Sequence, residues 1–209
     1  MTAEHHRPVL QPAHQFDWLI GSDDAGAAQR VAQETSWALL SRVRGDSDPR
    51  VVEQVIGIAE TDGIDDIAEL WSQASPHSLA GQLWRIYLLR RVVGANPLET
   101  TDLYLRGLQV AATIDPVVAG VAEPINPDSL MHLCDTILRG AFRGDLALAL
   151  DRASSYCRVV AMGAAALADE RDLIDDAHSA ELTTRALRYD AFANELRSGA
   201  RRWQDGNLD

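Results

Sequence analysis

The most constraining feature of this sequence is its last third. From Asp145 to Trp203 there is no proline, and between Gly163 and Gly199 there is no glycine. Proline and glycine are the residues that most readily interrupt a helix. Apolar residues recur there every three or four positions, as on one face of an α-helix. The segment predicts two long helices joined near residues 169–172 as an antiparallel hairpin; one unbroken helix is the alternative.

The preceding residues predict six shorter helices with clear start signals. Asp48 and Asn126 each stand before a proline, a pattern typical of a helix N-terminus. Asn96 begins another such pattern, in which Glu99 can close a capping box. The expected helices cover about 23–44, 48–63, 64–71, 78–93, 96–113 and 126–143. Strand signals are missing, so we expect an all-α bundle of about seven to eight helices.

The helices are expected to form one domain over residues 21–209. Residues 1–20 contain Pro8 and Pro12 and predict an extended arm, whose apolar run 16–20 docks on the core. Residues 115–126 (DPVVAGVAEPIN) predict the one long loop, which is a possible subdomain boundary. The helix at 78–93 is apolar nearly all round, so we expect it in the middle of the bundle.

The basic residues are all arginines, 19 in number, and the net charge is −12. Without lysine there is no Schiff base and no P-loop lysine. An acidic field opposes binding to nucleic acid and to anionic membranes, so neither partner is expected. The sequence also lacks a Gly-x-Ser-x-Gly elbow, a His-Glu-x-x-His pair and a dinucleotide fingerprint, which disfavours an enzyme.

The two cysteines, Cys134 and Cys157, fall on apolar helix faces and show no metal-ligand spacing. We interpret them as buried thiols, which favours a reducing cytosol. No stretch has the length and apolarity of a signal peptide core or of a membrane span. A cytoplasmic location is therefore expected.

Two sets of carboxylates and histidines have the spacing of metal ligands on a helix. They are Asp128, His132 and Asp135, and Asp175, His178 and Glu181. His132 lies about 200° around its helix from Leu130, at ~100° per residue, and therefore on the wet face. A bundle metal site needs ligands that point inward. Solvated charged faces explain both sets better, and no cofactor is expected.

A small-molecule pocket beside the helix at 78–93 is a second hypothesis. Trp71, Trp84 and Tyr87 would line it, and Arg85, with Arg90 and Arg91, would orient an anion. Packing in the core is the alternative explanation for these aromatic residues.

The last helix carries two apolar stripes, roughly opposite each other. The first, taken to face the core, is Leu173, Ala177, Ala180 and Leu187; the second is Leu182, Ala186, Tyr189, Ala193 and Leu196. A helix that is apolar on two faces must be covered twice. Our main hypothesis is therefore a cytosolic interaction or regulatory module that self-associates or binds a protein partner. The alternative is that the bundle itself covers both faces. A ligand-binding domain and a metal-dependent enzyme are the other functional hypotheses.

Three phrases, HRPVL, FDWLI and SLAGQLWRIYLLR, resemble those of small, acidic, lysine-poor, all-helical proteins from actinobacteria. The phrases cover about a quarter of the chain. The resemblance implies an all-helical fold and a cytosolic setting, and it implies no activity.

Overall fold

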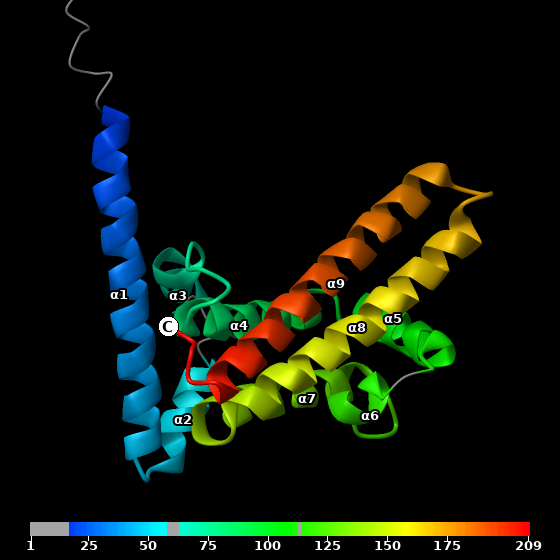
Figure 1. The fold of residues 1–209 in the computed structure, drawn as a ribbon. Coiled ribbons are helices and arrows are strands. Elements are labelled where there is room, and N and C mark those ends of the chain that lie inside the picture. Colours follow the sequence, from blue (N-terminus) through cyan, green and yellow to red (C-terminus); the bar gives the residue numbers. More distant parts are fainter. Residues whose placement is uncertain (1–16, 58–62, 113) are drawn as a thin grey trace, which may run out of the picture.

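The computed structural model describes residues 17–57, 63–112 and 114–209, and side chains from residue 26 onward except within 58–65 and at 113. Over these ranges the chain forms nine helices and no strand (Figure 1), which confirms the all-α prediction. The helices are α1 (Asp17–Gly45), α2 (Pro49–Gly57), α3 (Gly63–Trp71), α4 (Leu79–Ala95), α5 (Pro97–Val110), α6 (Asp115–Ala119), α7 (Pro127–Arg143), α8 (Leu146–Arg171) and α9 (Asp176–Gln204).

The last two helices form the predicted antiparallel hairpin, with the turn at residues 172–175. Asp145 begins α8 by accepting hydrogen bonds from the N–H groups of Ala147 and Leu148. Asp175 begins α9 by accepting one from the N–H of His178, at 3.1 Å. Each side chain satisfies N–H groups that have no partner inside the helix.

Helix α8 is the centre of the molecule, because α4, α5, α6, α7 and α9 all contact it. Its closest neighbour besides α9 is α5. Gly107 of α5 and Gly163 of α8 have no side chain to separate the two backbones. Beside them the rings of Tyr104 and Tyr156 stack with centroids 5.3 Å apart. A tightly packed helix crossing of this kind tolerates little added volume.

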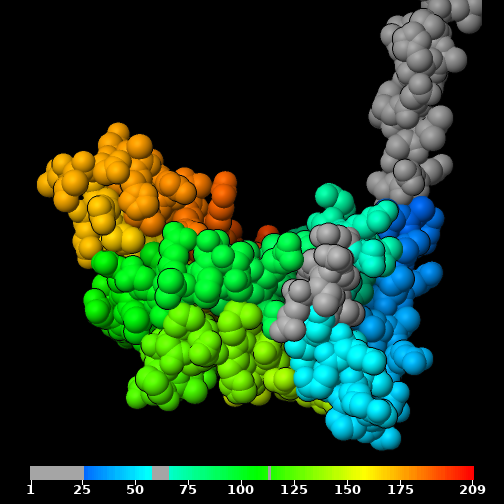
Figure 2. All heavy atoms as spheres, turned by 180° about the vertical axis from the view of Figure 1, so that it is seen from behind, coloured from blue at the N-terminus to red at the C-terminus, as the bar shows by residue number. Residues whose placement is uncertain are grey.

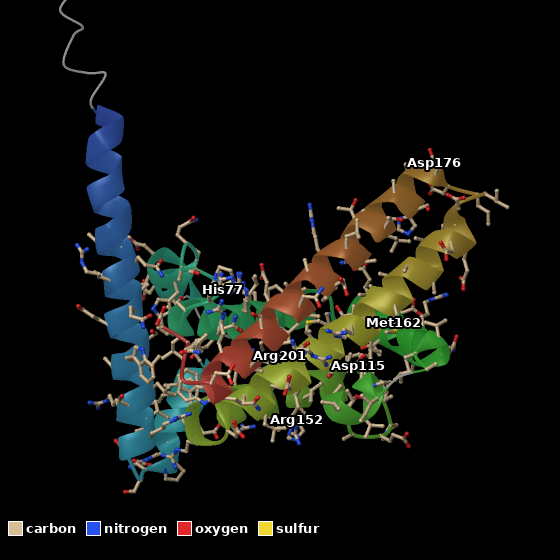
Figure 3. All side chains as sticks on the ribbon, in the orientation of Figure 1. His77, Asp115, Arg152, Met162, Asp176 and Arg201 are labelled. Carbon is tan, nitrogen blue, oxygen red and sulfur yellow. The ribbon has the colours of Figure 1, made fainter. Side chains whose placement is uncertain are left out.

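The prediction of a loop over residues 115–126 is wrong for its first part, because Asp115–Ala119 form α6. Asp115 is buried at the junction of α6, α8 and α9 (Figure 3). Its carboxylate accepts hydrogen bonds from Arg197 Nη2 at 3.2 Å and from Ser155 Oγ at 3.3 Å. These bonds hold α6 on the hairpin, and α6 accounts for the ninth helix.

The capping box predicted at Asn96 and Glu99 is also wrong. The N–H of Asn96 donates to the carbonyl of Val92 at 3.3 Å and thereby ends α4. Asn96 makes no side-chain cap, and Glu99 pairs instead with Arg185 of α9. Because one residue joins α4 to α5, its N–H is already used when α5 begins.

Helix α1 begins at Asp17, so residues 17–20 are helical and not extended as predicted. The rest of the predicted arm, residues 1–16, lies outside the described residues. The buried face of α1 is Ala32, Ser36, Leu40 and Val43, whereas Val31 is exposed. In a space-filling view from behind, the end of the α8–α9 hairpin stands out from the body (Figure 2).

Most of α4 is buried, as expected for a helix in the middle of the bundle. On α7 the apolar residues of one helix face are all buried: Leu130, Leu133, Cys134, Ile137, Leu138 and Ala141. Within the described ranges we find no helix with the length and apolarity required to cross a membrane.

Candidate functional site

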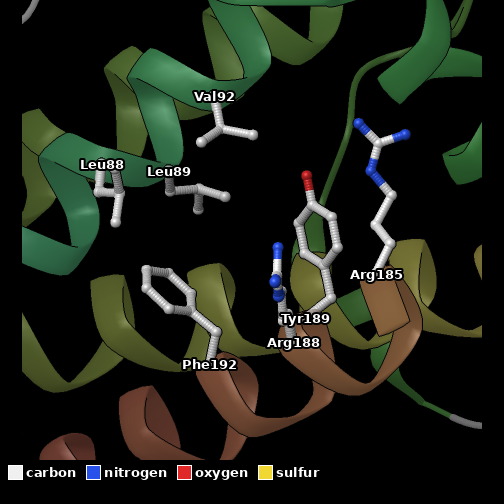
Figure 4. A pocket seen from close by; sticks show the side chains of 7 residues that line it. All are labelled: Leu88, Leu89, Val92, Arg185, Arg188, Tyr189 and Phe192. Carbon is white, nitrogen blue, oxygen red and sulfur yellow. The ribbon is translucent and has the colours of Figure 1, made fainter. Parts of the chain in front are cut away.

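A groove of about 390 Å³ lies between α4 and α9 and is the candidate functional site. Its lining is mainly apolar, and the side chains come from these two helices alone (Figure 4): Leu88, Leu89, Val92, Arg185, Arg188, Tyr189 and Phe192. The four lining residues of α9 fall within two turns of the helix, at positions 185, 188, 189 and 192. Residues three or four positions apart lie on the same side of a helix, so the four share one face. The groove is a concave apolar surface with two guanidinium groups beside it.

The cations of the groove differ in their pairing. Arg185 holds Glu99 at the start of α5, with Nη2 3.0 Å from Oε2. Arg188 is exposed and forms no ion pair with any residue that the structure describes. An unpaired guanidinium keeps all five of its N–H donors available. Arg188 is therefore the group best placed to receive an anion.

Tyr189 contributes a hydroxyl group that points toward α4 (Figure 4). Burial raises the pKa of Tyr189 above its usual value of 10.0. The hydroxyl therefore stays protonated at neutral pH and can donate a hydrogen bond into the groove.

Of the four predicted ligand-binding residues, the structure places only Arg85 next to this groove. Arg85 Nε lies 2.7 Å from Glu195 Oε2, and its guanidinium lies 6.0 Å from the ring of Phe192. Trp84 is half-buried and packs against the core.

The other two predicted ligand-binding residues, Trp71 and Tyr87, belong to the core. Trp71 Nε1 donates to Thr35 Oγ1 at 3.0 Å, and the Tyr87 hydroxyl donates to the carbonyl of Val55 at 2.8 Å. Their rings contact each other, with centroids 6.5 Å apart. Packing in the core thus accounts for both residues, and the four predicted residues do not form one site.

The predicted metal ligands are not brought together. Asp128 and His132 are exposed, and Asp135 binds Arg90 Nε at 2.7 Å. On α9, Asp175 caps the helix and His178 Nδ1 lies 3.9 Å from Glu181. Among the residues that the structure describes, no three or more candidate ligands gather at one point.

The two apolar stripes of the last helix are reversed relative to the prediction. Leu182, Ala193 and Leu196 of the second stripe are buried, and Tyr189 lines the groove. The first stripe, expected to face the core, is exposed: Leu173 is 96% and Leu187 is 67% exposed. The surface that motivated the prediction of self-association is therefore covered by the chain itself.

Sequence reasoning missed the α9 half of the groove. The signal available was the set Arg185, Arg188, Tyr189 and Phe192, which places two cations and two aromatic rings on one helix face. The sequence predicts a partner surface for Tyr189, because the position of α4 beside α9 depends on tertiary packing.

The Glu99–Arg185 pair at the edge of the groove predicts a measurable pKa shift. Hydrogen bonding to Arg185 holds the pKa of Glu99 below its usual value of 4.5. Because the folded-state pKa is the lower one, the pair stabilises the fold at neutral pH and loses that contribution as the pH falls through this pKa. We expect the pKa of Glu99, measured by NMR titration, to rise toward 4.5 in Arg185→Gln. The pKa of Glu53, which Arg139 lowers elsewhere, should not move; an unchanged Glu99 would contradict the pairing.

No protein-family model matches the sequence, and no curated protein and no solved structure matches the chain. The chemistry of the groove is therefore the basis on which a function can be proposed.

Proposed function

We propose that this chain is a helical binding module that holds a small amphipathic anion in the α4–α9 groove. The observation that carries the proposal is an apolar groove with an unpaired arginine, Arg188, at its edge. The volume of about 390 Å³ falls in the range of about 300–1,000 Å³ that small-molecule sites occupy.

The ligand class follows from the chemistry of the lining. Leu88, Leu89, Val92 and Phe192 offer a surface on which an apolar chain or ring is shielded from water. A guanidinium group binds carboxylate and phosphate in a bidentate manner. The Tyr189 hydroxyl adds a donor on the same side. A molecule with an aliphatic body and one terminal carboxylate or phosphate satisfies all three features.

Isothermal titration calorimetry with decanoate, octyl phosphate and decanol tests the proposal. We expect decanoate or octyl phosphate to bind more tightly than decanol, since only the anions engage Arg188. The comparison of the two anions shows which headgroup the groove prefers. Arg188→Gln should weaken anion binding by about tenfold, equivalent to ~1.4 kcal/mol, and leave decanol unchanged. Arg50→Gln, a change at an arginine with an 85% exposed side chain, is the matched control.

A second variant tests the apolar wall. Leu88→Glu places a carboxylate inside the groove and should abolish binding of both anions, whereas Leu148→Glu, at a leucine 50% exposed on α8, should not. Circular dichroism checks that both variants keep their helices. Absence of decanoate and octyl phosphate binding, or equal binding by Leu88→Glu and the wild type, would refute the proposed function.

We also propose a cytosolic location for the module. Cys134 and Cys157 are both free and buried. Burial raises the pKa of Cys134 to about 12, so this thiol remains protonated at neutral pH. Unpaired buried thiols are typical of proteins in a reducing compartment, which supports the proposal.

A further inference from the structure

We infer that α9 pairs antiparallel with α9 of a second copy of this chain. The surface involved, here called the outer face, comprises Ala177, Ala180, Thr184, Leu187 and Ala191. The outer face lies on a different side of α9 from the groove, and Arg188 stands at the edge that the two surfaces share. The inference goes beyond the proposed function.

The outer face is exposed along its whole length. All five residues are exposed, Leu187 to 67%. They lie on the side of α9 opposite Leu182, Ala193 and Leu196, which are buried. The apolar surface continues into the hairpin turn, where Leu173 is 96% and Ile174 is 78% exposed. Asp176, at the start of α9, lies at the end of the hairpin that stands clear of the other helices (Figure 3).

The spacing of the outer face is that of a helix-pairing surface. Its residues follow one another at intervals of three, four, three and four, which is the heptad pattern of two helices that pair side by side. Alanine at most positions lets two helices approach closely, and Leu187 supplies the larger apolar contact. An isolated helix face of this kind gains stability when a second apolar helix covers it.

Charge decides the direction of the pairing. Glu181 and Arg188 lie seven residues apart on the same edge of the outer face, and both are exposed. In an antiparallel pair, Glu181 can lie beside the partner subunit's Arg188, and the two-fold axis repeats this contact. In a parallel pair, Asp176 on one edge would instead lie beside the partner subunit's Glu181, and the two carboxylates would repel each other.

Charge also selects the register. One antiparallel register places Glu181 opposite the partner subunit's Glu181, which is unfavourable. The register displaced by one heptad places Glu181 beside the partner subunit's Arg188, Leu187 against the partner subunit's Thr184, and Ala180 against the partner subunit's Ala191. We assign this second register. Because a guanidinium has five donors, Arg188 can contact the partner subunit's Glu181 and an anion in the groove together.

Disulfide trapping tests direction and register in the full chain. The native cysteines are buried, so Ala180→Cys and Ala191→Cys each introduce one exposed thiol. We expect an equimolar mixture of the two variants to form a mixed cross-linked dimer on mild oxidation, and either variant alone to remain largely uncross-linked. Efficient cross-linking of either variant with itself would overturn the antiparallel register.

Analytical ultracentrifugation at micromolar concentration tests the pairing itself. We expect a dimer for the wild type, a monomer for Leu187→Glu, and at least tenfold weaker dimerisation for Glu181→Arg. Exchange of both charges, Glu181→Arg with Arg188→Glu, should restore the dimer, because the pair is re-formed with opposite polarity. A wild-type monomer would overturn the inference. The groove variant Leu88→Glu should remain a dimer, so failure of the groove proposal and failure of this inference give different results.

Discussion

Replacement of Gly163 by alanine is expected to lower the free energy of unfolding by about 3 kcal/mol or more. A Cβ atom at this position would overlap the carbonyl oxygen of Leu103 and lie 2.8 Å from the backbone nitrogen of Gly107. Both obstacles are backbone atoms of α5, so the overlap is relieved only if α5 moves away from α8. Urea denaturation, with the midpoint compared at constant m-value, measures the change.

Gly140→Ala is the matched control for this prediction. It is also a glycine inside a long helix, but a Cβ there would lie 3.6 Å from the Cβ of Ala149, an ordinary contact. Since alanine is the better helix former by roughly 0.5–1 kcal/mol, this variant should be as stable as the wild type or slightly more stable. Equal stability of the two variants would show that α5 and α8 do not approach as closely as described.

Trp71→Ala is expected to cost about 3–5 kcal/mol. Trp71 is 2% exposed, and its removal leaves a cavity between α1, α3 and α4 and removes the hydrogen bond that Thr35 Oγ1 accepts from Trp71 Nε1. Trp37→Ala should cost less, because Trp37 is 38% exposed and mainly stacks on Trp203. Thermal unfolding followed by circular dichroism compares the two variants.

A second substitution at Trp71 tests whether this core residue contributes to ligand binding. Trp71→Phe keeps most of the ring volume, so enough folded protein should remain for calorimetry. We expect its affinity for decanoate to equal that of the wild type, because Trp71 does not line the groove. A loss of affinity in Trp71→Phe, with no loss in Leu88→Glu, would move the binding site to the aromatic residues that the sequence first suggested.

The parts of the fold that sequence predicted are those that local signals determine. The α8–α9 hairpin follows from a long segment without proline. The start of α7 follows from Asn126, whose side-chain Oδ1 accepts a hydrogen bond from the N–H of Ser129 at 2.9 Å. The exceptions depend on distant contacts. The buried carboxylate of Asp115 accepts a hydrogen bond from Arg197, which lies far along the chain. Glu99 pairs with Arg185 of α9 and does not close a capping box at the start of α5.

The candidate site was less predictable than the fold for the same reason. Periodicity identifies two apolar stripes on α9 but does not tell which one α8 covers, and the prediction chose the wrong one. It likewise drew attention to Trp71 and Tyr87, whose polar atoms are satisfied inside the core. The side of α4 that meets α9, with Leu88 and Val92, becomes visible only when the two helices are placed together.

The central position of α8 has a consequence for the order in which the protein is completed during synthesis. Helices α4, α5, α6 and α7 precede α8 in the chain, yet each contacts it. While residues 146–171 are still inside the ribosome, α4 and α7 can already pack on each other, but the faces of α5 and α6 that pack on α8 have no partner. Nascent chains with exposed apolar surface are prone to aggregation and are substrates for chaperones. The part of the native core that α8 forms with α5 and α6 is therefore completed late, when most of the chain has already been translated.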